Sequence, residues 1–266
     1  MRNVEQEAIG RFLDRLLLRS PLTRKEQEEI LALEGFVERY AAHRDIVSPG
    51  ERVKHACLIG EGLAGRFDQM ADGRRQITAF QIAGDMSDLL SVVIPMASWS
   101  ITALSQVTVF RYSHEQLNRL ITTYPGIAFA FWRDTAVDGS LVEKWVGNLG
   151  RKNAQSRVAH LFCEMGMRME AAGLGSRTSY AFPVTQEQLA DAVGLTPVHT
   201  NRVIQELRAK NRLTFRSGQV EMLDFEALAG DAEFDPSYLI LRMPGDRQAT
   251  RVNLQSTVRE PPAPAQ

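Results

Sequence analysis

The feature that most constrains this chain is a pair of short helical patterns separated by one glycine, within 185-TQEQLADAVGLTPVHTNRVIQEL-207. Thr185 and Gln188 form a capping-box pattern that begins the first helix, and Gly194 follows its end, where a left-handed residue is favoured. 196-TP-197 is suited to begin the second helix, because a hydroxyl caps its free N–H groups and proline lacks one. Two capped helices joined by so short a turn predict a helix-turn-helix.

Apolar positions and a hairpin pattern complete this C-terminal unit. The second helix carries apolar residues on one side, where they would cover a core: Leu195, Val203, Ile204 and Leu207. The run 213-LTFRSGQVEMLD-224 has Ser217-Gly218 at its centre, which predicts a tight turn between two strands, a wing. Generic helical hairpins rarely combine both caps, the glycine and a wing.

The N-terminal half favours two helices followed by short strands. Apolar residues recur at helical spacing over the first twenty positions, and Ser20-Pro21 interrupts them. Thr23 and Glu26 form another capping-box pattern, which predicts a second helix running through Leu31 and Leu33.

After Pro49 the sequence changes to short runs separated by glycine. Asp72-Gly73 lies between two such runs and predicts a hairpin, because its turn requires positive φ. The run 99-WSITALSQVTVFRY-112 alternates and is interpreted as one half-buried strand. Several short strands with glycine turns predict a small sandwich or β-roll.

A long helix is predicted over residues 127–149, after a helix that begins at Ser113 and ends at Tyr124-Pro125-Gly126. Its outer residues recur at three- and four-residue spacing: Trp132, Thr135, Gly139, Val142, Val146 and Leu149. Such a stripe either packs on the β-roll of its own chain or forms a seam between two chains, and we favour the seam because the helix is long. A hinge is predicted at Asn148, Gly150 and Asn153.

Charge and composition narrow the class of protein. The 266 residues carry a net charge of −1, yet ten basic and five acidic residues fall between 151 and 217, so that stretch is +5 and the remainder −6. A basic segment in an otherwise acidic chain indicates a nucleic-acid partner. The alternative is that the excess of basic residues arises by chance on solvent-exposed helix faces. Two cysteines are too few for a disulfide framework.

Other protein classes find no support in the sequence. No apolar run is long enough for a membrane span and the N-terminus is not a secretion signal, so we expect a cytoplasmic protein without membrane contact. Motifs of common enzymes, such as G-x-S-x-G, a Walker A loop or H-E-x-x-H, do not occur, so no enzyme is predicted. The helix-turn-helix with its basic residues predicts a DNA-binding regulator. The alternative is an effector-binding or scaffold protein of the same fold that no longer binds DNA.

Together these features resemble the Crp/Fnr family of bacterial transcription regulators. The resemblance covers residues 20–243 and rests on Gly62, 73-GRRQI-77, Gly84-Asp85, the long helix, 185–207 and a trailing segment, 224–241. It implies an α+β fold with an N-terminal jelly-roll-like β-roll of the cyclic-nucleotide-binding type, a long dimerisation helix and a C-terminal winged helix-turn-helix.

The resemblance also divides the chain into parts. These are an N-terminal arm (1–20), a cyclic-nucleotide-binding-like sensor domain (21–124), the dimerisation helix and hinge (125–152), the winged helix-turn-helix domain (153–228) and a C-terminal extension with a disordered tail (229–266). We expect a homodimer whose interface contains Trp132, Gly139, Val142, Val146 and Leu149. The expected partner is double-stranded DNA with an inverted-repeat operator. RNA polymerase is a further partner if the protein is an activator.

The second helix of the motif would present its first turns to base edges in the major groove. Its outward candidates are Val198, His199, Asn201, Arg202 and Gln205. Arg202, at the position of the family's base-reading arginine, suits guanine, Asn201 suits adenine, and Val198 suits a thymine methyl group. For His199 an exposed position without a base contact is an equal alternative. Phosphate contacts are expected from Thr185, Gln186, Thr200 and Arg208.

Positions in the recognition helix and in the effector pocket depart from the family, and Val142 and Glu143 stand where cAMP-binding relatives carry hydroxyls. Val198 stands where many relatives carry a glutamate that accepts from cytosine, so the operator should differ from the usual one. The resemblance implies an effector pocket at Gly84, Asp85, Ser98, Val142 and Glu143, but 95-PMASWSITA-103 contains Ala97 where cAMP-binding relatives have the phosphate-binding arginine. We therefore do not expect cAMP to bind.

No cofactor or metal is predicted. An iron–sulfur cluster of the Fnr type needs four thiolates, and this chain has Cys57 and Cys163 only. Haem would need a histidine such as His43, His55, His114 or His160, which are more simply structural. Cys163 is interpreted as a core thiol, with a redox switch as the alternative.

Overall fold

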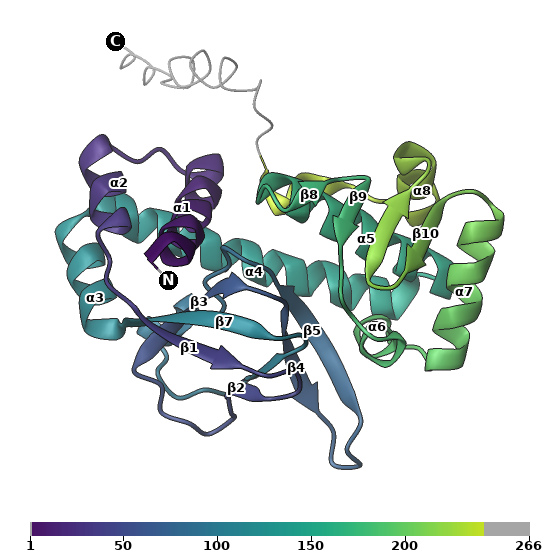
Figure 1. The fold of residues 1–266 in the computed structure, drawn as a ribbon, viewed down its shortest axis with the longest axis horizontal. Coiled ribbons are helices and arrows are strands. Elements are labelled where there is room, and N and C mark those ends of the chain that lie inside the picture. Colours follow the sequence, from purple (N-terminus) through teal and green to yellow (C-terminus); the bar gives the residue numbers. More distant parts are fainter. Residues whose placement is uncertain (1, 242–266) are drawn as a thin grey trace, which may run out of the picture.

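The computed structural model describes residues 2–241, and the tail predicted to be disordered from Met243 lies outside them. Figure 1 shows two bodies along one long helix: N-terminal helices with a β-sandwich at one end, and a smaller helix-and-hairpin unit at the other. The predicted fold class is confirmed. No helix in the described range is long and apolar enough to cross a membrane.

Two helices begin the chain. α1 (Arg2–Arg19) ends before Ser20-Pro21, as predicted, and α2 (Arg24–Leu31) begins with the complete capping box of Thr23 and Glu26. The predicted second helix was two residues too long, because Leu33 lies beyond its end. Apolar residues of α1, among them Phe12 and Leu16, are buried against the sandwich and the long helix.

Seven antiparallel strands form the sandwich. One sheet has the order β1 (Phe36–Tyr40), β7 (Val107–Ser113), β3 (His55–Glu61); the other has β2 (Asp45–Val47), β6 (Ser100–Ala103), β4 (Ala64–Gln69), β5 (Arg75–Gln81). Apolar side chains of both sheets, such as Ile59, Ile101 and Val109, meet between them. Gly73 has a φ of +85°, as the predicted hairpin between β4 and β5 requires.

The single strand predicted over 99–112 is wrong, because the chain crosses from one sheet to the other at residues 104–106. There the N–H groups of Leu104 and Ser105 donate to the carbonyl oxygen of Leu63, at 2.8 and 3.2 Å, and the Ser105 hydroxyl accepts from Leu63 N–H. The alternating pattern continues across this turn because both flanking strands bury alternate residues in the same core.

Helical segments lie between and after the strands of the sandwich. After β5, η1 (Leu89–Val92) is a short 3-10 turn, and α3 (His114–Thr123) is capped by Ser113. Gln116 does not complete the predicted capping box, because its side-chain oxygen accepts from Glu34 N–H at 3.4 Å instead of from Ser113 N–H. Its side-chain amide donates to the carbonyl oxygen of Glu34 at 3.1 Å.

The long helix is α4 (Pro125–Arg151). It begins two residues earlier than predicted, because Pro125 occupies its first turn. The predicted hinge is corrected: Asn148 and Gly150 lie within the helix, and the break falls at the extended Lys152 and at Asn153, which caps the next helix.

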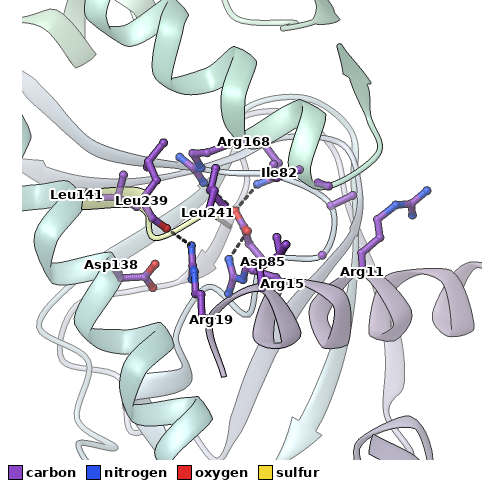
Figure 2. A pocket seen from close by; sticks show the side chains of 15 residues that line it. Arg11, Arg15, Arg19, Ile82, Asp85, Asp138, Leu141, Arg168, Leu239 and Leu241 are labelled. Carbon is purple, nitrogen blue, oxygen red and sulfur yellow. Dashed lines mark hydrogen bonds and ion pairs between the residues drawn. The ribbon is translucent and has the colours of Figure 1, made fainter. Parts of the chain in front are cut away.

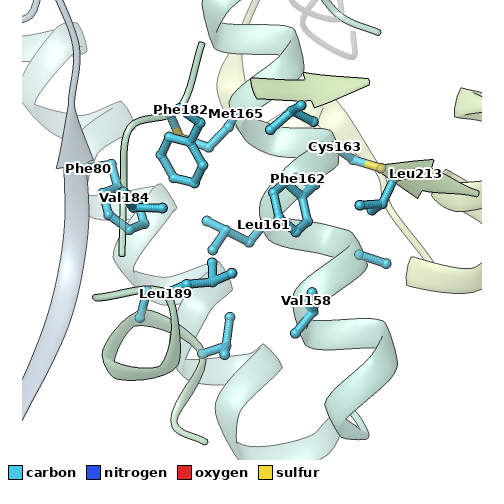
Figure 3. Close-up of a cluster of buried hydrophobic side chains, with 14 of the residues drawn as sticks. Phe80, Val158, Leu161, Phe162, Cys163, Met165, Phe182, Val184, Leu189 and Leu213 are labelled. Atoms are coloured by element: carbon cyan, nitrogen blue, oxygen red, sulfur yellow. The ribbon is translucent and has the colours of Figure 1, made fainter. Parts of the chain in front are cut away.

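The C-terminal unit contains four helices and a small sheet. The helices are α5 (Ala154–Ala171), α6 (Gln186–Val193), α7 (Pro197–Ala209) and α8 (Phe225–Ala232), followed by the 3-10 turn η2 (Pro236–Leu239). The sheet has the order β10 (Leu213–Arg216), β11 (Gln219–Met222), β9 (Ser179–Ala181), β8 (Gly175–Ser176). Figure 3 shows its core, in which Phe162 of α5 lies among Phe182, Leu161 and Leu213.

This unit packs on the sandwich through apolar side chains. The rings of Phe80 and Phe182 are 4.9 Å apart in an edge-to-face arrangement, and both belong to a cluster that includes Leu189 of α6. Gln76 of β5 donates to the carbonyl oxygen of Ala192 in α6 at 3.1 Å. The helix-turn-helix is therefore held against the β4–β5 hairpin.

Candidate nucleic-acid interface

The caps predicted for the helix-turn-helix are present. The Thr185 hydroxyl accepts from Gln188 N–H at 3.1 Å, and the Gln188 side chain accepts from Thr185 N–H at 2.9 Å. Gly194 ends α6 with φ +63° and ψ +44°, and the Thr196 hydroxyl accepts from His199 N–H at 3.2 Å to begin α7. Local sequence thus sets both helix boundaries and the angle of the turn between them.

One face of α7 is buried and the opposite face is open to solvent. Val203, Ile204 and Leu207 pack into the core, as predicted. Val198 is 82% exposed and the side chain of Arg202 is 68% exposed, and Gln205 is exposed on the same face. Because 198, 202 and 205 follow at four- and three-residue steps, they form one stripe along the helix.

The remaining predicted residues divide by exposure. His199, Asn201 and Arg208 are half-buried, and Thr185 and Gln186 are exposed at the start of α6. The prediction for Thr200 as a phosphate contact is wrong, because its side chain is completely buried. Thr200 lies three and four residues before Val203 and Ile204, so it shares their inward face.

Two basic residues outside the predicted set follow α7 along the chain. Arg216 is exposed at the end of β10, next to the wing turn, where Ser217 and Gly218 have φ of +50° and +73°. Lys210 follows α7 and donates to the side chain of Gln155 at 2.8 Å.

Arg202 is held by one weak contact. Its Nε lies 3.8 Å from a carboxylate oxygen of Glu206, one turn later, in an ion pair exposed to solvent. Exposed pairs of this kind are worth little free energy, so the guanidinium can exchange Glu206 for another acceptor.

The predicted seam of α4 is open to solvent along most of its length. Trp132 and Val146 are 69% and 64% exposed, Gly139 is exposed, and Thr135 and Val142 are half-buried. The stripe that α4 buries within its own chain is a different one: Ile127, Ala130, Phe131, Val137, Leu141 and Trp145. The alternative that the predicted stripe packs on the β-roll does not describe this structure.

Two details of that seam differ from the prediction. Leu149 packs against the turn of the helix-turn-helix, where its Cδ2 would approach a Cβ at Gly194 to 2.9 Å. Phe129, which was not predicted, is 61% exposed and stacks on Trp132 with ring centres 6.1 Å apart.

The predicted effector residues do not meet in one site. Gly84 and Asp85 line a cavity at the junction of α1, α4 and α5, shown in Figure 2, whereas Ser98, Val142 and Glu143 do not line it. Asp85 is already paired: one oxygen accepts from Arg15 of α1, and the other accepts from Arg168 of α5 at 2.9 Å. Sequence patterns could not show these partners, which lie about seventy and eighty residues away along the chain.

Other charged groups surround the same cavity. Asp134 of α4 accepts from Arg15 at 2.6 Å and also from Arg19. Burial, together with the charge of Asp134, raises the pKa of Asp138 to about 6, and burial lowers the pKa of Arg19. The region is a network of buried and half-buried guanidinium and carboxylate groups rather than an open nucleotide pocket.

Ala97 occupies the place where the resemblance implies a phosphate-binding arginine. Its N–H donates to the Glu51 carbonyl oxygen at 2.9 Å and its own carbonyl oxygen accepts from Gly50 N–H at 2.7 Å. Its side chain is a buried methyl group, so this position offers no cation to a cyclic phosphate.

The thiols and histidines have structural surroundings. Cys57 and Cys163 are buried, and burial raises the pKa of the Cys163 thiol to about 12, which disfavours the reactive thiolate. His114 bonds to the Ser91 hydroxyl at 2.8 Å. Among the residues that the structure describes, no group of three or more His, Cys, Asp or Glu side chains is arranged to hold a metal ion.

Comparisons with known proteins identify both halves. Residues 37–124 match the cyclic nucleotide-binding domain family, and residues 156–230 match the Crp-like helix-turn-helix domain family. The chain is 23% identical to the transcriptional activator protein FnrL of Cereibacter sphaeroides, over 82% of this chain and 89% of that protein. It is 27% identical to the transcriptional activatory protein AadR of Rhodopseudomonas palustris, over 72% and 80%.

Solved structures agree on the fold. The structure of FixK2 from Bradyrhizobium japonicum superposes with a TM-score of 0.65 at 24% identity, covering 74% of this chain and 97% of that one. These relatives are transcription regulators and not enzymes. The sensor-type sandwich, the long helix and the Crp-like helix-turn-helix together place this chain in the Crp/Fnr family of transcription regulators.

Proposed function

We propose that this regulator binds an inverted-repeat DNA operator as a homodimer and reads bases through the exposed stripe of α7. The observation that carries the proposal is the stripe itself, in which Arg202 projects from the face opposite the buried Val203 and Ile204. A helix of this kind fits the major groove, and its first turns approach base edges. The protein acts on DNA in the cytoplasm.

Each exposed residue has a role that follows from its chemistry. Arg202 offers a planar fork to O6 and N7 of guanine, Asn201 pairs with adenine, and Val198 touches a thymine methyl group. His199 and Gln205 lie beside them and add contacts to neighbouring bases. Thr185, Gln186 and Arg208 contact phosphates and set the register. The Thr185 hydroxyl accepts the cap bond and still has its hydrogen to donate.

Arg202→Ala and Arg208→Ala separate base reading from phosphate binding. Arg202→Ala should lose about 1–3 kcal/mol per half-site and relax the preference at one base pair, whereas Arg208→Ala should weaken binding to all sequences alike. Fluorescence anisotropy with a set of operator variants measures both. Unchanged base preferences in Arg202→Ala would refute the orientation given to α7, and absence of DNA binding by the wild-type chain would favour the scaffold alternative.

The homodimer forms along α4. Phe129, Trp132 and Val146 form an apolar stripe that the described part of the chain leaves uncovered. An isologous contact would bury the same residues from both chains. Gly139 and the half-buried Val142 lie on the same side of the helix and would allow the two α4 helices to approach closely. The two α7 helices would then be related by a two-fold axis, as an inverted repeat requires. An activator would also contact RNA polymerase.

The domain division follows the same elements. The arm (1–20) and sensor domain (21–124) contain α1 to α3 and the sandwich, and 125–152 contains α4 with the break after Arg151. The DNA-binding domain (153–228) begins with α5. The extension (229–266) begins within α8.

The signal is a molecule other than cAMP. The side chain of Ala97 offers no cation to a phosphate, and Asp85 is already bound to Arg15 and Arg168. A ribose hydroxyl would have to displace an arginine from Asp85, and the cyclic phosphate would gain no compensating ion pair. Calorimetric titration with cAMP should show no binding, and micromolar affinity would refute this conclusion.

A further inference from the structure

A second connection between the two bodies runs through the segment that follows α8. Residues 233–241, which we call the C-terminal strap, contain η2 and return from α8 toward α1, as Figure 1 shows. At the start of the strap, Lys152 Nζ donates to the carbonyl oxygen of Glu233 at 3.2 Å, and η2 contacts α4. The strap therefore lies along the break between α4 and α5.

Tyr238 is the central contact of the strap. Its ring stacks on His160 of α5 with ring centres 6.0 Å apart, and Lys144 Nζ of α4 lies 5.2 Å from the ring centre. Its hydroxyl donates to a carboxylate oxygen of Glu164 at 2.8 Å, and the same oxygen accepts from Trp145 Nε1 of α4 at 2.9 Å. Glu164 is completely buried, so water does not compete for these bonds. One carboxylate thus joins α4, α5 and the strap.

Leu239 extends this joint toward the sensor domain. Its side chain is 1% exposed and belongs to a small cluster with Leu141 of α4 and Met167 of α5. Its carbonyl oxygen accepts from Nη2 of Arg19 in α1 at 3.3 Å, a bond drawn in Figure 2. The strap is therefore bonded to helices on both sides of the break.

The strap and the sandwich hold α5 from opposite sides. Phe162 and Met169 belong to the cluster that contains Phe80 of β5. His160 and Glu164, which contact the strap, lie on the opposite face of α5, because a step of two residues turns a helix by about 200°. Contacts on one face alone would let α5 pivot at the break, whereas contacts on both faces fix its direction.

We propose that the strap is a positioning element for DNA recognition and that Tyr238 is its positioning residue. It fixes the direction of α5 relative to α4. Because Val203 and Leu207 of α7 share a core cluster with Phe162 of α5, α7 turns with α5. The strap thereby sets the separation and rotation of the two α7 helices about the two-fold axis. This inference rests on the proposed function, since only a dimer that reads two half-sites converts this geometry into a preferred half-site spacing.

Operators of different half-site spacing test the proposal. Inserting two base pairs rotates one half-site by about 70° relative to the other. In fluorescence anisotropy we expect the wild type to lose about tenfold or more in affinity on this insertion. Tyr238→Ala should bind the uninterrupted operator more weakly and lose less than about threefold on insertion, because its α5 can pivot. Tyr238→Phe keeps the ring and removes the hydroxyl, so it should fall between the two.

Three controls separate positioning from loss of structure. Binding to an isolated half-site should be equal in the wild type and both Tyr238 variants, since α7 itself is unchanged. Phe36→Ala removes an exposed aromatic ring of β1 and should keep the spacing preference of the wild type. A chain that ends at Phe234 lacks most of the strap and should lose the spacing preference, compared with a chain that ends at Leu241. Tyr238→Phe decides the question if the larger changes do not fold.

A distance measurement tests the strap without DNA. Spin labels on Arg39→Cys of β1 and Gln205→Cys of α7, both exposed positions, span the two bodies, and the native cysteines are buried. Labelled chains are diluted with unlabelled protein so that distances within one chain dominate. The distance distribution should be narrow in the wild type and broader in Tyr238→Ala.

The two measurements distinguish the strap from the proposed function. If the wild type binds operators but Tyr238→Ala and the chain ending at Phe234 keep its spacing preference and its distance distribution, the strap proposal is wrong and the proposed function stands. If no DNA is bound while the distribution broadens in Tyr238→Ala, the strap does fix the direction of α5 and the proposed function is wrong.

Discussion

His160 provides a pH dependence whose size follows from its hydrogen bonds. It is 1% exposed on α5, its Nδ1 lies 3.3 Å from Lys152 Nζ, and its Nε2 lies 3.0 Å from the Tyr238 hydroxyl. Lysine can only donate, so Nδ1 accepts and Nε2 carries the hydrogen that goes to Tyr238. The Tyr238 hydroxyl in turn donates to buried Glu164 at 2.8 Å. This assignment requires a neutral imidazole.

Burial, and then the charges of Lys152 and Lys144, lower the pKa of His160 to about 3. The unfolded chain takes up a proton near its ordinary pKa of about 6.5, so stability is present above that pH and is lost below it. Between about pH 7.5 and about pH 4.5 this single group should cost about 2.5 kcal/mol of unfolding free energy.

Urea denaturation of the wild type and His160→Gln at both pH values measures this cost. His160→Gln keeps a donor for Tyr238 and does not titrate, so it should lose about 2.5 kcal/mol less than the wild type on acidification. Lys152→Met removes one cause of the low pKa and should fall between the two. Equal losses in the wild type and His160→Gln would refute the neutral, buried imidazole.

Three further perturbations test other parts of the structure. Val146→Glu should dissociate the dimer in sedimentation experiments. The control Leu223→Glu changes a residue that is exposed outside α4 and should leave the dimer intact. An undiminished dimer of Val146→Glu would show that the interface does not involve this residue. Burial and Asp134 raise the pKa of Asp138 to about 6, so the stability that its proton confers is lost as the pH rises from about 4 to about 6. Asp138→Asn should therefore stabilise the protein above about pH 6 and not below about pH 4, which pH-dependent melting checks. Gly194→Ala should lower the free energy of unfolding by about 1–2 kcal/mol in denaturation, because it places a Cβ at positive φ and against Leu149. The control Gly230→Ala in α8 has open space for its Cβ and should raise the free energy of unfolding by about 0.5–1 kcal/mol. A tolerated Gly194→Ala would contradict the turn geometry.

Features that depend on a few adjacent residues were predictable. The caps at Thr185, Thr196 and Asn153 each need only the residue itself and the free N–H two or three positions on, so sequence alone places them. The burial of Thr200 could also have been predicted, from helical spacing. It lies within one turn of Val203 and Ile204, and the same rotation that exposes Arg202 buries it.

Features that depend on distant segments were not predictable. Asp85 meets Arg15 and Arg168 only because α1 and α5 converge on one turn of the sandwich. β8 and β9 have two and three residues, too few for a periodic pattern. β9 forms because it pairs with β11, and β8 because it pairs with β9. The predicted strand over 99–112 failed because alternation says which residues are buried and not which sheet they join.

Selection of DNA from a random library by the full-length protein tests the central claim most directly. A homodimer that reads bases through α7 should enrich an inverted repeat whose half-site centres are about one helical turn apart, and Arg202→Ala should lose one specified base pair in each half. Enrichment of no sequence, or of a single site without two-fold symmetry, would contradict the account.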